Sequence, residues 1–180
     1  VVEPQGILSK FDINKTRLWS SSFVKKLENQ IMNANFVFIS IRWSAKKGYQ
    51  DWLPLIINQL KEVNPNIELI LFDNTVEFFY PVPDLWMRYN STDKSNTFNS
   101  FLSTFRDPII LKEVNPRLLR WANENELRIV SKFDLACPYL YCSGLDNEGN
   151  LIYYDYGHWT LEGAKFFGKS LLNNSLLADK

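Results

Sequence analysis

The chain has 180 residues, of which 46% are hydrophobic and 22% charged, and this composition excludes a disordered or fibrous protein. Twenty basic residues balance twenty acidic ones, and the longest basic runs are the pairs Lys25-Lys26 and Lys46-Lys47, so a nucleic-acid-binding protein is not expected. No apolar run approaches the roughly 18 residues of a membrane helix, and residues 1–10 lack the apolar segment of a signal peptide.

The first half of the chain predicts two helices and two strands in alternation. Apolar side chains recur every four residues over 16–34, as in an amphipathic helix, and residues 36–43 form an apolar run typical of a strand covered on both faces. Residues 51–66 predict a second helix with Asp51 as its N-cap, and residues 67–73 predict a second buried strand. This order indicates an α/β protein.

The second half begins with residues 74–111, rich in Pro, Asn and Ser, which we expect to be an irregular insertion within the domain. A helix over 115–127, a strand over 128–138 and a final helix over 160–172 follow, the last with Thr160 as its N-cap. Alternating helices and strands predict one α/β domain over the whole chain, with a three-layer, doubly wound parallel sheet.

In open α/β sheets, functional groups gather beyond the carboxyl ends of the strands. This rule selects polar or aromatic residues next to each predicted strand and before the last helix. They are Arg42, Trp43 and Ser44, then Asp73 and Asn74, then Asp134, and finally Asp155 and His158.

Asp155 and His158 form the pattern most suited to catalysis. A carboxylate three residues ahead of the only histidine, on a turn eased by Gly157, can reach the Nδ1 proton of the imidazole. It would fix the tautomer and stabilise the imidazolium that forms when Nε2 accepts a proton, as in a hydrolase triad. The alternative is a histidine that only makes capping contacts before a helix.

Residues 151–171, LIYYDYGHWTLEGAKFFGKSL, resemble the last motif block of the SGNH (GDSL-like) hydrolase superfamily, in which D-x-x-H precedes a helix that opens with [LW]-[ST]-x-x-G. The chain is more narrowly similar to the SGNH domain attached to acyltransferase family three membrane proteins. FVFISIRW at 36–43 resembles the strand of this subgroup that ends in Arg-Trp, and KFDLACPYLYC at 132–142 resembles its cysteine-bearing segment.

The resemblance implies an SGNH/flavodoxin-like fold and Ser-His-Asp acyl-transfer chemistry. It makes His158 the general base and Asp155 its orienting partner. Groups near the strand ends would bind the oxyanion or the substrate. The candidates for this role are Arg42, Trp43, Ser44 and Asn74.

The chain departs from the superfamily at its first motif block, because no G-D-S, G-N-S or G-x-S-x-G segment occurs. We therefore expect the nucleophilic serine and its strand to lie upstream of Val1, in a longer protein from which this chain was excised. Ser44, at the end of a predicted strand, is the alternative within the chain, although it lacks the glycine-assisted turn that exposes such serines.

Cys137 and Cys142 are spaced too widely for a C-x-x-C motif, so we expect neither a metal nor a cofactor. A local disulfide between them, together with N-x-S/T sequons at Asn14, Asn90 and Asn173, favours an extracytoplasmic glycoprotein. The alternative is two free buried cysteines in a cytosolic protein.

The sequence thus predicts the SGNH-type part of an O-acyltransferase or an acyl or carbohydrate esterase. Its partners would be an acyl donor, a hydroxyl acceptor such as a glycan, and an upstream transmembrane acyltransferase domain that tethers it to the membrane. Two alternatives remain: a catalytically inactive module that binds a glycan or a protein, and a flavodoxin-like domain with an unrelated ligand. The missing Gly-rich phosphate loop argues against nucleotide binding.

Overall fold

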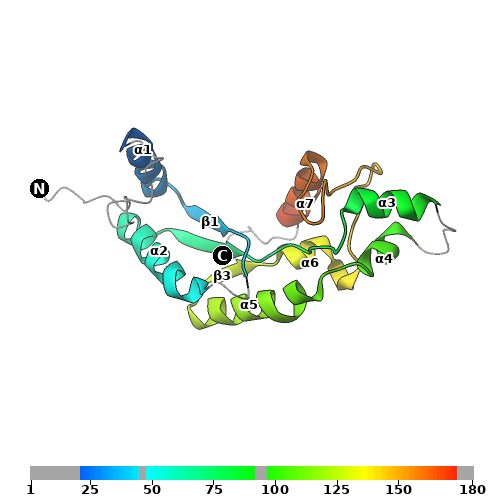
Figure 1. Cartoon of the computed structure of the whole chain (residues 1–180). Helices are drawn as coiled ribbons and strands as arrows, with labels where there is room; N and C mark the ends of the chain where they lie inside the picture. The colour runs from blue at the N-terminus through cyan, green and yellow to red at the C-terminus, as the bar shows by residue number, and fades with distance from the viewer. Residues whose placement is uncertain (1–20, 45–47, 92–96, 174–180) are drawn as a thin grey trace, which may run out of the picture. The chain divides into compact units, whose positions relative to one another are not determined.

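The computed structural model describes residues 21–44, 48–91 and 97–173 (Figure 1). These residues form two compact units, the first within residues 1–39 and 46–71 and the second within 40–45 and 72–180. The strands are β1 (Phe36–Ser40), β2 (Glu68–Phe72) and β3 (Arg128–Val130), and they pair in the order β1-β2-β3. The predicted α/β class with a parallel sheet is confirmed.

The first unit holds helices α1 (Ser21–Met32) and α2 (Tyr49–Val63). The start of the helix predicted over 16–34 lies outside the described residues. Helix α2 buries the apolar stripe of Leu53, Ile57 and Leu60. Asp51 was predicted as its N-cap, which is wrong: its own N–H already donates to the Gly48 carbonyl at 3.0 Å, so the first turn closes before it.

Strand β1 differs from the prediction in length and in cover. It ends at Ser40 instead of residue 43, because the Trp43 N–H donates to the Asn74 side chain and leaves the sheet. Its side chains are not covered on both faces: Phe36 and Phe38 remain 41% and 47% exposed. The apolar run therefore marks the strand but not its burial, which depends on what packs above each face.

Two helices occupy the segment 74–111, which we expected to be irregular: α3 (Val82–Ser91) and α4 (Phe98–Ser103), which lie side by side in Figure 1. Aromatic rings that are scattered along the sequence pack against one another here. The ring centroids of Trp86 and Phe98, for example, lie 4.8 Å apart. The Thr97 hydroxyl caps α4 by accepting the Ser100 N–H. Aromatic packing across the connection thus overrides a composition that favours loops.

The segment that follows is mostly helical. A π-helical turn, η2 (Ile110–Val114), runs directly into α5 (Asn115–Glu124), close to the helix predicted there. The strand predicted over 128–138 stops at Val130 and gives way to α6 (Lys132–Ala136) and a short 3-10 turn, η3 (Pro138–Leu140). The cause is Ser131, whose hydroxyl caps α6 by accepting the Asp134 N–H at 3.0 Å.

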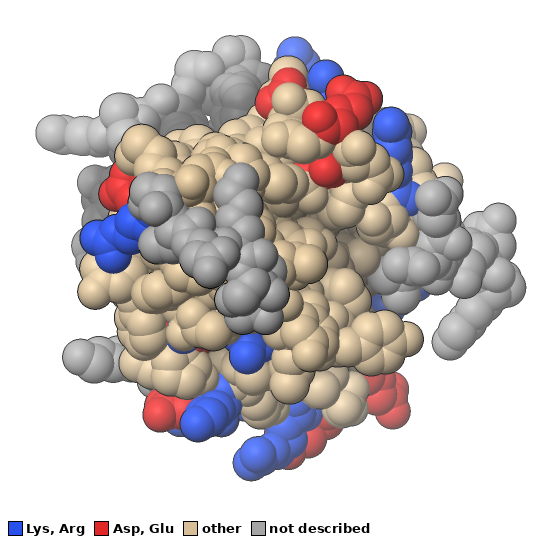
Figure 2. Space-filling view, turned by 90° about the vertical axis from the view of Figure 1, so that its right-hand side faces the viewer, with Lys and Arg blue, Asp and Glu red and all other residues tan. Residues whose placement is uncertain are grey.

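The last helix, α7 (Leu161–Asn173), matches its prediction and contacts α6. The Thr160 hydroxyl accepts the Gly163 N–H at 3.0 Å, which is the capping bond that the sequence predicted. None of the helices in the described parts of the chain combines the length and the apolar character needed to span a bilayer. Figure 2 shows Lys or Arg side chains close to Asp or Glu side chains at several places on the surface of the described residues.

Candidate active site

The turn at 155–158 brings Asp155 and His158 together. Asp155 Oδ1 accepts the backbone N–H of Gly157 and of His158, both at 2.8 Å, and Asp155 Oδ2 lies 2.7 Å from His158 Nδ1. One carboxylate therefore holds both the backbone and the ring of the histidine. The His158 side chain is 60% exposed. With Nδ1 paired to the carboxylate, Nε2 is the ring nitrogen left to exchange protons with a substrate.

The environment of Asp155 keeps its carboxylate ionised. Burial raises the pKa of Asp155, but the N–H groups of His158 and Gly157 and the imidazole outweigh that effect and hold the pKa below its usual value of 3.8. The Tyr154 ring stacks on the imidazole at 5.6 Å between centroids. An ionised carboxylate and a flat aromatic neighbour both limit how the imidazole can turn.

The turn is anchored to the rest of the second unit through its backbone. The carbonyls of Asp155 and Tyr156 accept the N–H groups of Val82 and Phe78, at 3.1 and 2.8 Å. A β-carbon at Gly157 would lie 3.3 Å from the Val76 carbonyl oxygen, so a larger residue would require a small shift of the turn or of this segment. The position of the histidine is thus set by segments far from it in sequence.

Thr160 and Gly163 join the turn to α7. The Thr160 hydroxyl donates to the Leu151 carbonyl at 2.9 Å while it accepts the Gly163 N–H. At Gly163, a β-carbon would overlap the Ile152 carbonyl. The T-x-x-G pattern after the histidine therefore has a physical cause, because only glycine lets α7 approach this backbone so closely.

A cleft of about 250 Å³ opens beside His158 in the second unit. Of the residues predicted to bind the oxyanion or substrate, Arg42 and Asn74 line it, whereas Trp43 and Ser44 are not among its lining residues. The other lining residues come from the ends of β1 and β3, the stretch after β2 and the histidine turn. They are Ser40, Ile41, Thr75, Glu77, Lys132, Tyr156 and Gly157.

Arg42 is held by a residue that the sequence did not suggest. Its Nε and Nη2 donate to the two carboxylate oxygens of Glu77 at 2.9 and 2.7 Å, and its guanidinium lies 5.9 Å from the centre of the Tyr156 ring. Hydrogen bonding to Glu77 raises the pKa of Arg42 above its usual value. The guanidinium keeps further N–H groups beyond these two bonds.

Asn74 and Trp43 form a reciprocal pair. The Asn74 side chain accepts the Trp43 N–H at 2.8 Å and donates to the Trp43 carbonyl at 2.9 Å. The indole of Trp43 is buried and donates to the Phe72 carbonyl at 2.7 Å. These bonds fasten the segment after β1 to the end of β2, which is a structural use of both side chains.

The structure adds Lys132 and Ser40 to the cleft, and the sequence prediction missed both. Lys132 Nζ donates to Ser40 Oγ at 3.1 Å. Both residues sit at the carboxyl ends of strands, where the general rule would have selected them. They were overlooked because the predicted strands ran on to residues 43 and 138 and placed both residues inside them.

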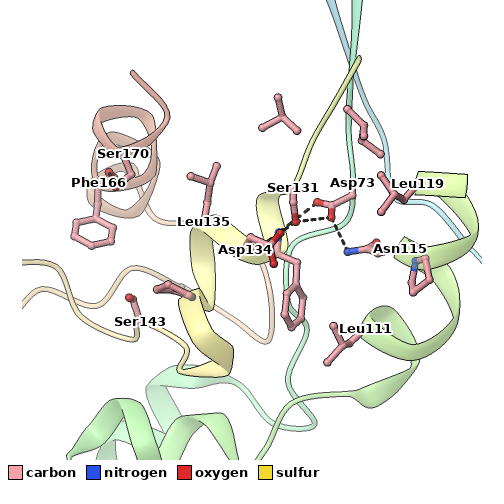
Figure 3. Close-up of a pocket in the computed structure, with 15 residues that line it drawn as sticks. Asp73, Leu111, Asn115, Leu119, Ser131, Asp134, Leu135, Ser143, Phe166 and Ser170 are labelled. Carbon is pink, nitrogen blue, oxygen red and sulfur yellow. Dashed lines mark hydrogen bonds between the residues drawn. The ribbon is translucent and has the colours of Figure 1, made fainter. Parts of the chain in front are cut away.

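Asp73, nominated for its place after β2, has a different role. It is 5% exposed, and its carboxylate accepts the Ser131 hydroxyl, the Asn115 amide and the N–H groups of Lys132 and Phe133 (Figure 3). Burial raises the pKa of Asp73 to about 6, against the opposing effect of the bonds from Ser131, Phe133 and Lys132. The carboxylate thereby connects the end of β2 to α5 and α6.

A larger cavity of about 780 Å³ lies next to Asp73, between α5, α6 and α7 (Figure 3). Asp134 lines it, together with apolar side chains such as Leu111, Leu119 and Phe166. Neither Asp155 nor His158 does. The smaller cleft is therefore the candidate active site, because it holds the histidine that can exchange protons.

Cys137 and Cys142 are joined in a disulfide. The loop that it closes contains Tyr139 and Leu140, both with positive φ, at 51° and 68°. Non-glycine residues rarely adopt this conformation. The cross-link thus holds a strained turn directly after α6.

A profile of the family described as "SGNH domain (fused to AT3 domains)" matches residues 6–173. The solved periplasmic domain of the lipopolysaccharide acetyltransferase of Salmonella ser. Paratyphi A matches with a TM-score of 0.66 at 18% identity, over 85% of this chain and 62% of that chain. A possible lipase from Chitinophaga pinensis DSM 2588 matches with a TM-score of 0.40 at 11% identity, over 88% of this chain and 80% of that one.

No protein of curated function matches the sequence. The likeness to the Salmonella domain shows a shared fold, and this chain spans 62% of the length of that domain.

Proposed function

The chain belongs to the family of SGNH domains fused to AT3 domains, and from this premise we propose that it carries out acyl transfer involving a hydroxyl group, as part of an O-acyltransferase or an esterase. The observation that supports the proposal most directly is the 2.7 Å contact between Asp155 Oδ2 and His158 Nδ1 beside an open cleft. The family match spans both compact units, so we also propose that the two belong to one SGNH domain.

In the proposed mechanism, His158 is the general base and Asp155 its orienting partner. His158 Nε2 accepts the proton of a serine hydroxyl as the serine oxygen attacks the acyl carbonyl, and Asp155 stabilises the resulting imidazolium. The imidazolium then gives that proton to the departing alcohol oxygen, which leaves an acyl-serine. His158 then takes the proton of a second hydroxyl or water, whose oxygen bonds to the acyl carbon. The bond to the serine oxygen breaks, and the serine recovers its proton from His158.

We propose that the serine comes from outside this segment. Within the parts of the chain that the structure describes, no serine is hydrogen-bonded to the His158 ring, whose partner is Asp155. Ser40 lines the cleft but accepts a bond from Lys132, and Ser44 is not among the lining residues. Arg42 is the oxyanion candidate that the geometry favours, because it lines the cleft and keeps N–H groups beyond those bound to Glu77.

For location and partners, we propose an extracytoplasmic domain attached to a transmembrane acyltransferase domain. The family description names fusion to AT3 domains, and the similar Salmonella protein is a periplasmic domain of a lipopolysaccharide acetyltransferase. A glycan hydroxyl is accordingly the acceptor that we propose for this chain.

A non-catalytic glycan- or protein-binding module is the second candidate. It is favoured by the internal use of two predicted site residues, since Arg42 is paired with Glu77 and the Asn74 amide with the Trp43 backbone. In such a module the Asp155–His158 contact would only shape the turn.

The deciding experiment compares hydrolysis of p-nitrophenyl acetate by the full-length protein with that by its His158→Ala variant. We expect kcat/KM to fall by about 10²- to 10⁴-fold, the usual contribution of a general base. Lys165→Ala, an exposed change on α7, serves as the matched control and should keep full activity. Equal rates for the wild type and His158→Ala would leave the binding module as the better explanation.

A further inference from the structure

Lys132 places a positive charge in the wall of the candidate active-site cleft. The residue follows β3 and opens α6, and its backbone N–H donates to the buried Asp73 carboxylate at 2.6 Å. Its side chain bonds to a different partner: Nζ donates to Ser40 Oγ at 3.1 Å, and both residues line the cleft. The ammonium is therefore held at a defined position in the cleft that also contains His158.

The other charges of the cleft are compensated by close partners. Arg42 forms an ion pair with Glu77, and His158 faces Asp155, each pair at 2.7 Å. The ion pairs found among the described residues do not include Lys132. Asp73 attracts it from a greater distance, while that carboxylate accepts four hydrogen bonds from neutral donors. Among the described residues of the cleft, Lys132 is thus a cation without a carboxylate in direct contact.

Holding this charge in place costs solvation free energy. Lys132 is half-buried, and desolvation lowers the pKa of its ammonium despite the attraction of Asp73. A partly desolvated cation is stabilised by any anion that enters the cleft, and more strongly than in open water. The site is therefore suited to a negatively charged ligand group.

We propose that Lys132 and Ser40 bind an anionic group, a carboxylate or a phosphate, of the molecule whose hydroxyl reacts at His158. The inference rests on the proposed acyl-transfer function and adds the class of substrate: an acidic glycan or a phosphorylated one. A lysine ammonium has three donors, one of which goes to Ser40, so two remain for the anion. Because Ser40 Oγ accepts from Lys132, its own hydroxyl proton is free to donate to the same anion.

The only histidine of the chain provides a reporter for this test. The imidazole resonances of His158 are followed by NMR while the protein is titrated with glucuronate, glucose 6-phosphate or glucose at constant ionic strength and pH. We expect saturable shifts with one or both anions and none with glucose. The anion that binds more tightly tells whether the group is a carboxylate or a phosphate. Equal shifts with glucose, or no saturable shift with either anion, would overturn the proposal.

Variants separate this site from a general attraction of anions. Lys132→Met should weaken binding of the better anion by about tenfold or more, as expected for loss of a charge-assisted hydrogen bond, and Lys132→Arg should restore most of it. Lys112→Met, which removes an exposed lysine outside the cleft, should bind as the wild type does. Ser40→Ala, which keeps the charge and the fold of α6, should weaken binding by a smaller factor.

Unchanged binding in both Lys132→Met and Ser40→Ala would show that the anion binds elsewhere. The readout is binding and not turnover, so it is independent of whether the acyl-transfer proposal holds. Loss of anion binding in Lys132→Met would support the anion site. Full esterase activity of His158→Ala in the same study would contradict the catalytic role of His158 and leave the anion site supported.

Discussion

Two aspartates of the second unit show how differently one side chain can be used. Asp155 has a side chain 26% exposed and pairs with the imidazole of His158, and its pKa lies below the usual value. Asp73 is 5% exposed and accepts bonds from neutral donors on two segments, α5 and the start of α6, and burial raises its pKa to about 6. Both carboxylates lie near strand ends or turns, where a sequence argument nominates catalytic groups.

The difference lies in the neighbours of each carboxylate. Asp155 faces a titratable ring that opens to a cleft, so its charge can support proton transfer at His158. Asp73 is surrounded by the Asn115 amide, the Ser131 hydroxyl and two backbone N–H groups, so it cross-links β2, α5 and α6. A buried carboxylate that accepts bonds from neutral donors holds secondary-structure elements together. A partly exposed carboxylate next to an imidazole is suited to a catalytic pair.

The largest expected effect is on activity when Asp155 is changed. In the full-length protein, Asp155→Ala should lower kcat/KM for p-nitrophenyl acetate by about a thousandfold, because His158 loses the group that orients it and stabilises its cation. The exposed Asp134, which lies outside the cleft, supplies the control Asp134→Ala. An equal loss in both variants would point to a general effect of removing acidic residues.

For stability, we expect Asp73→Ala to have a larger effect than Asp155→Ala. Asp73→Ala leaves buried donors of Asn115 and of the α6 backbone without an acceptor, so the free energy of unfolding should fall by about 3 kcal/mol. Asp155→Ala should cost less than about 1 kcal/mol, because water can solvate the exposed turn. Urea unfolding of the two variants measures both values. Similar losses would mean that Asp155 is as structural as Asp73.

The raised pKa of Asp73 predicts a pH dependence of stability. The native state binds more protons than the unfolded chain between the usual pKa of 3.8 and the folded value of about 6, so stability falls as the pH rises through this window. The decrease should be on the order of 3 kcal/mol. The difference in unfolding free energy between the wild type and Asp73→Ala should therefore be larger near about pH 4 than near about pH 7.

Asp155 should act with the opposite sign and in a lower window. The pKa of Asp155 is lowered by folding. Its ionised carboxylate therefore stabilises the native state above pH 3.8, the usual pKa, and this stabilisation is lost as the pH falls below that value. If the unfolding free energies of the wild type and of Asp73→Ala differed by the same amount at every pH, the assignment of the raised pKa to Asp73 would be contradicted.

A smaller loss of stability than in Asp73→Ala is expected at the disulfide after α6. Replacing Cys137 and Cys142 by serine should lower the free energy of unfolding by about 2 kcal/mol, the value expected for so short a closed loop. Esterase activity per folded molecule should remain, because the loop is not among the residues that line the cleft. Thermal unfolding under matched conditions measures the loss of stability. If the fully folded variant lost esterase activity, the disulfide loop would have to contribute to the active site.

Short-range features of this molecule were readable from the sequence. The Asp155–His158 contact joins side chains three residues apart on one turn, and the Thr160 cap and Gly163 follow in a fixed local pattern. The class of fold followed from alternating helix and strand patterns, whose periods depend only on neighbouring residues. Contacts within one turn depend mainly on local backbone geometry, so spacing can suggest them, although the Asp51 cap shows that spacing alone can also mislead.

Long-range features were decided by tertiary structure. Glu77 holds Arg42 across 35 residues, Lys132 reaches Ser40 across 92, and Asp73 gathers donors 42 to 60 positions away. Nothing in the spacing of these residues signals a contact, because their proximity depends on where strands end and which faces are covered. Burial then distinguished the two aspartates, since the pKa of a carboxylate changes with the dielectric and the donors around it.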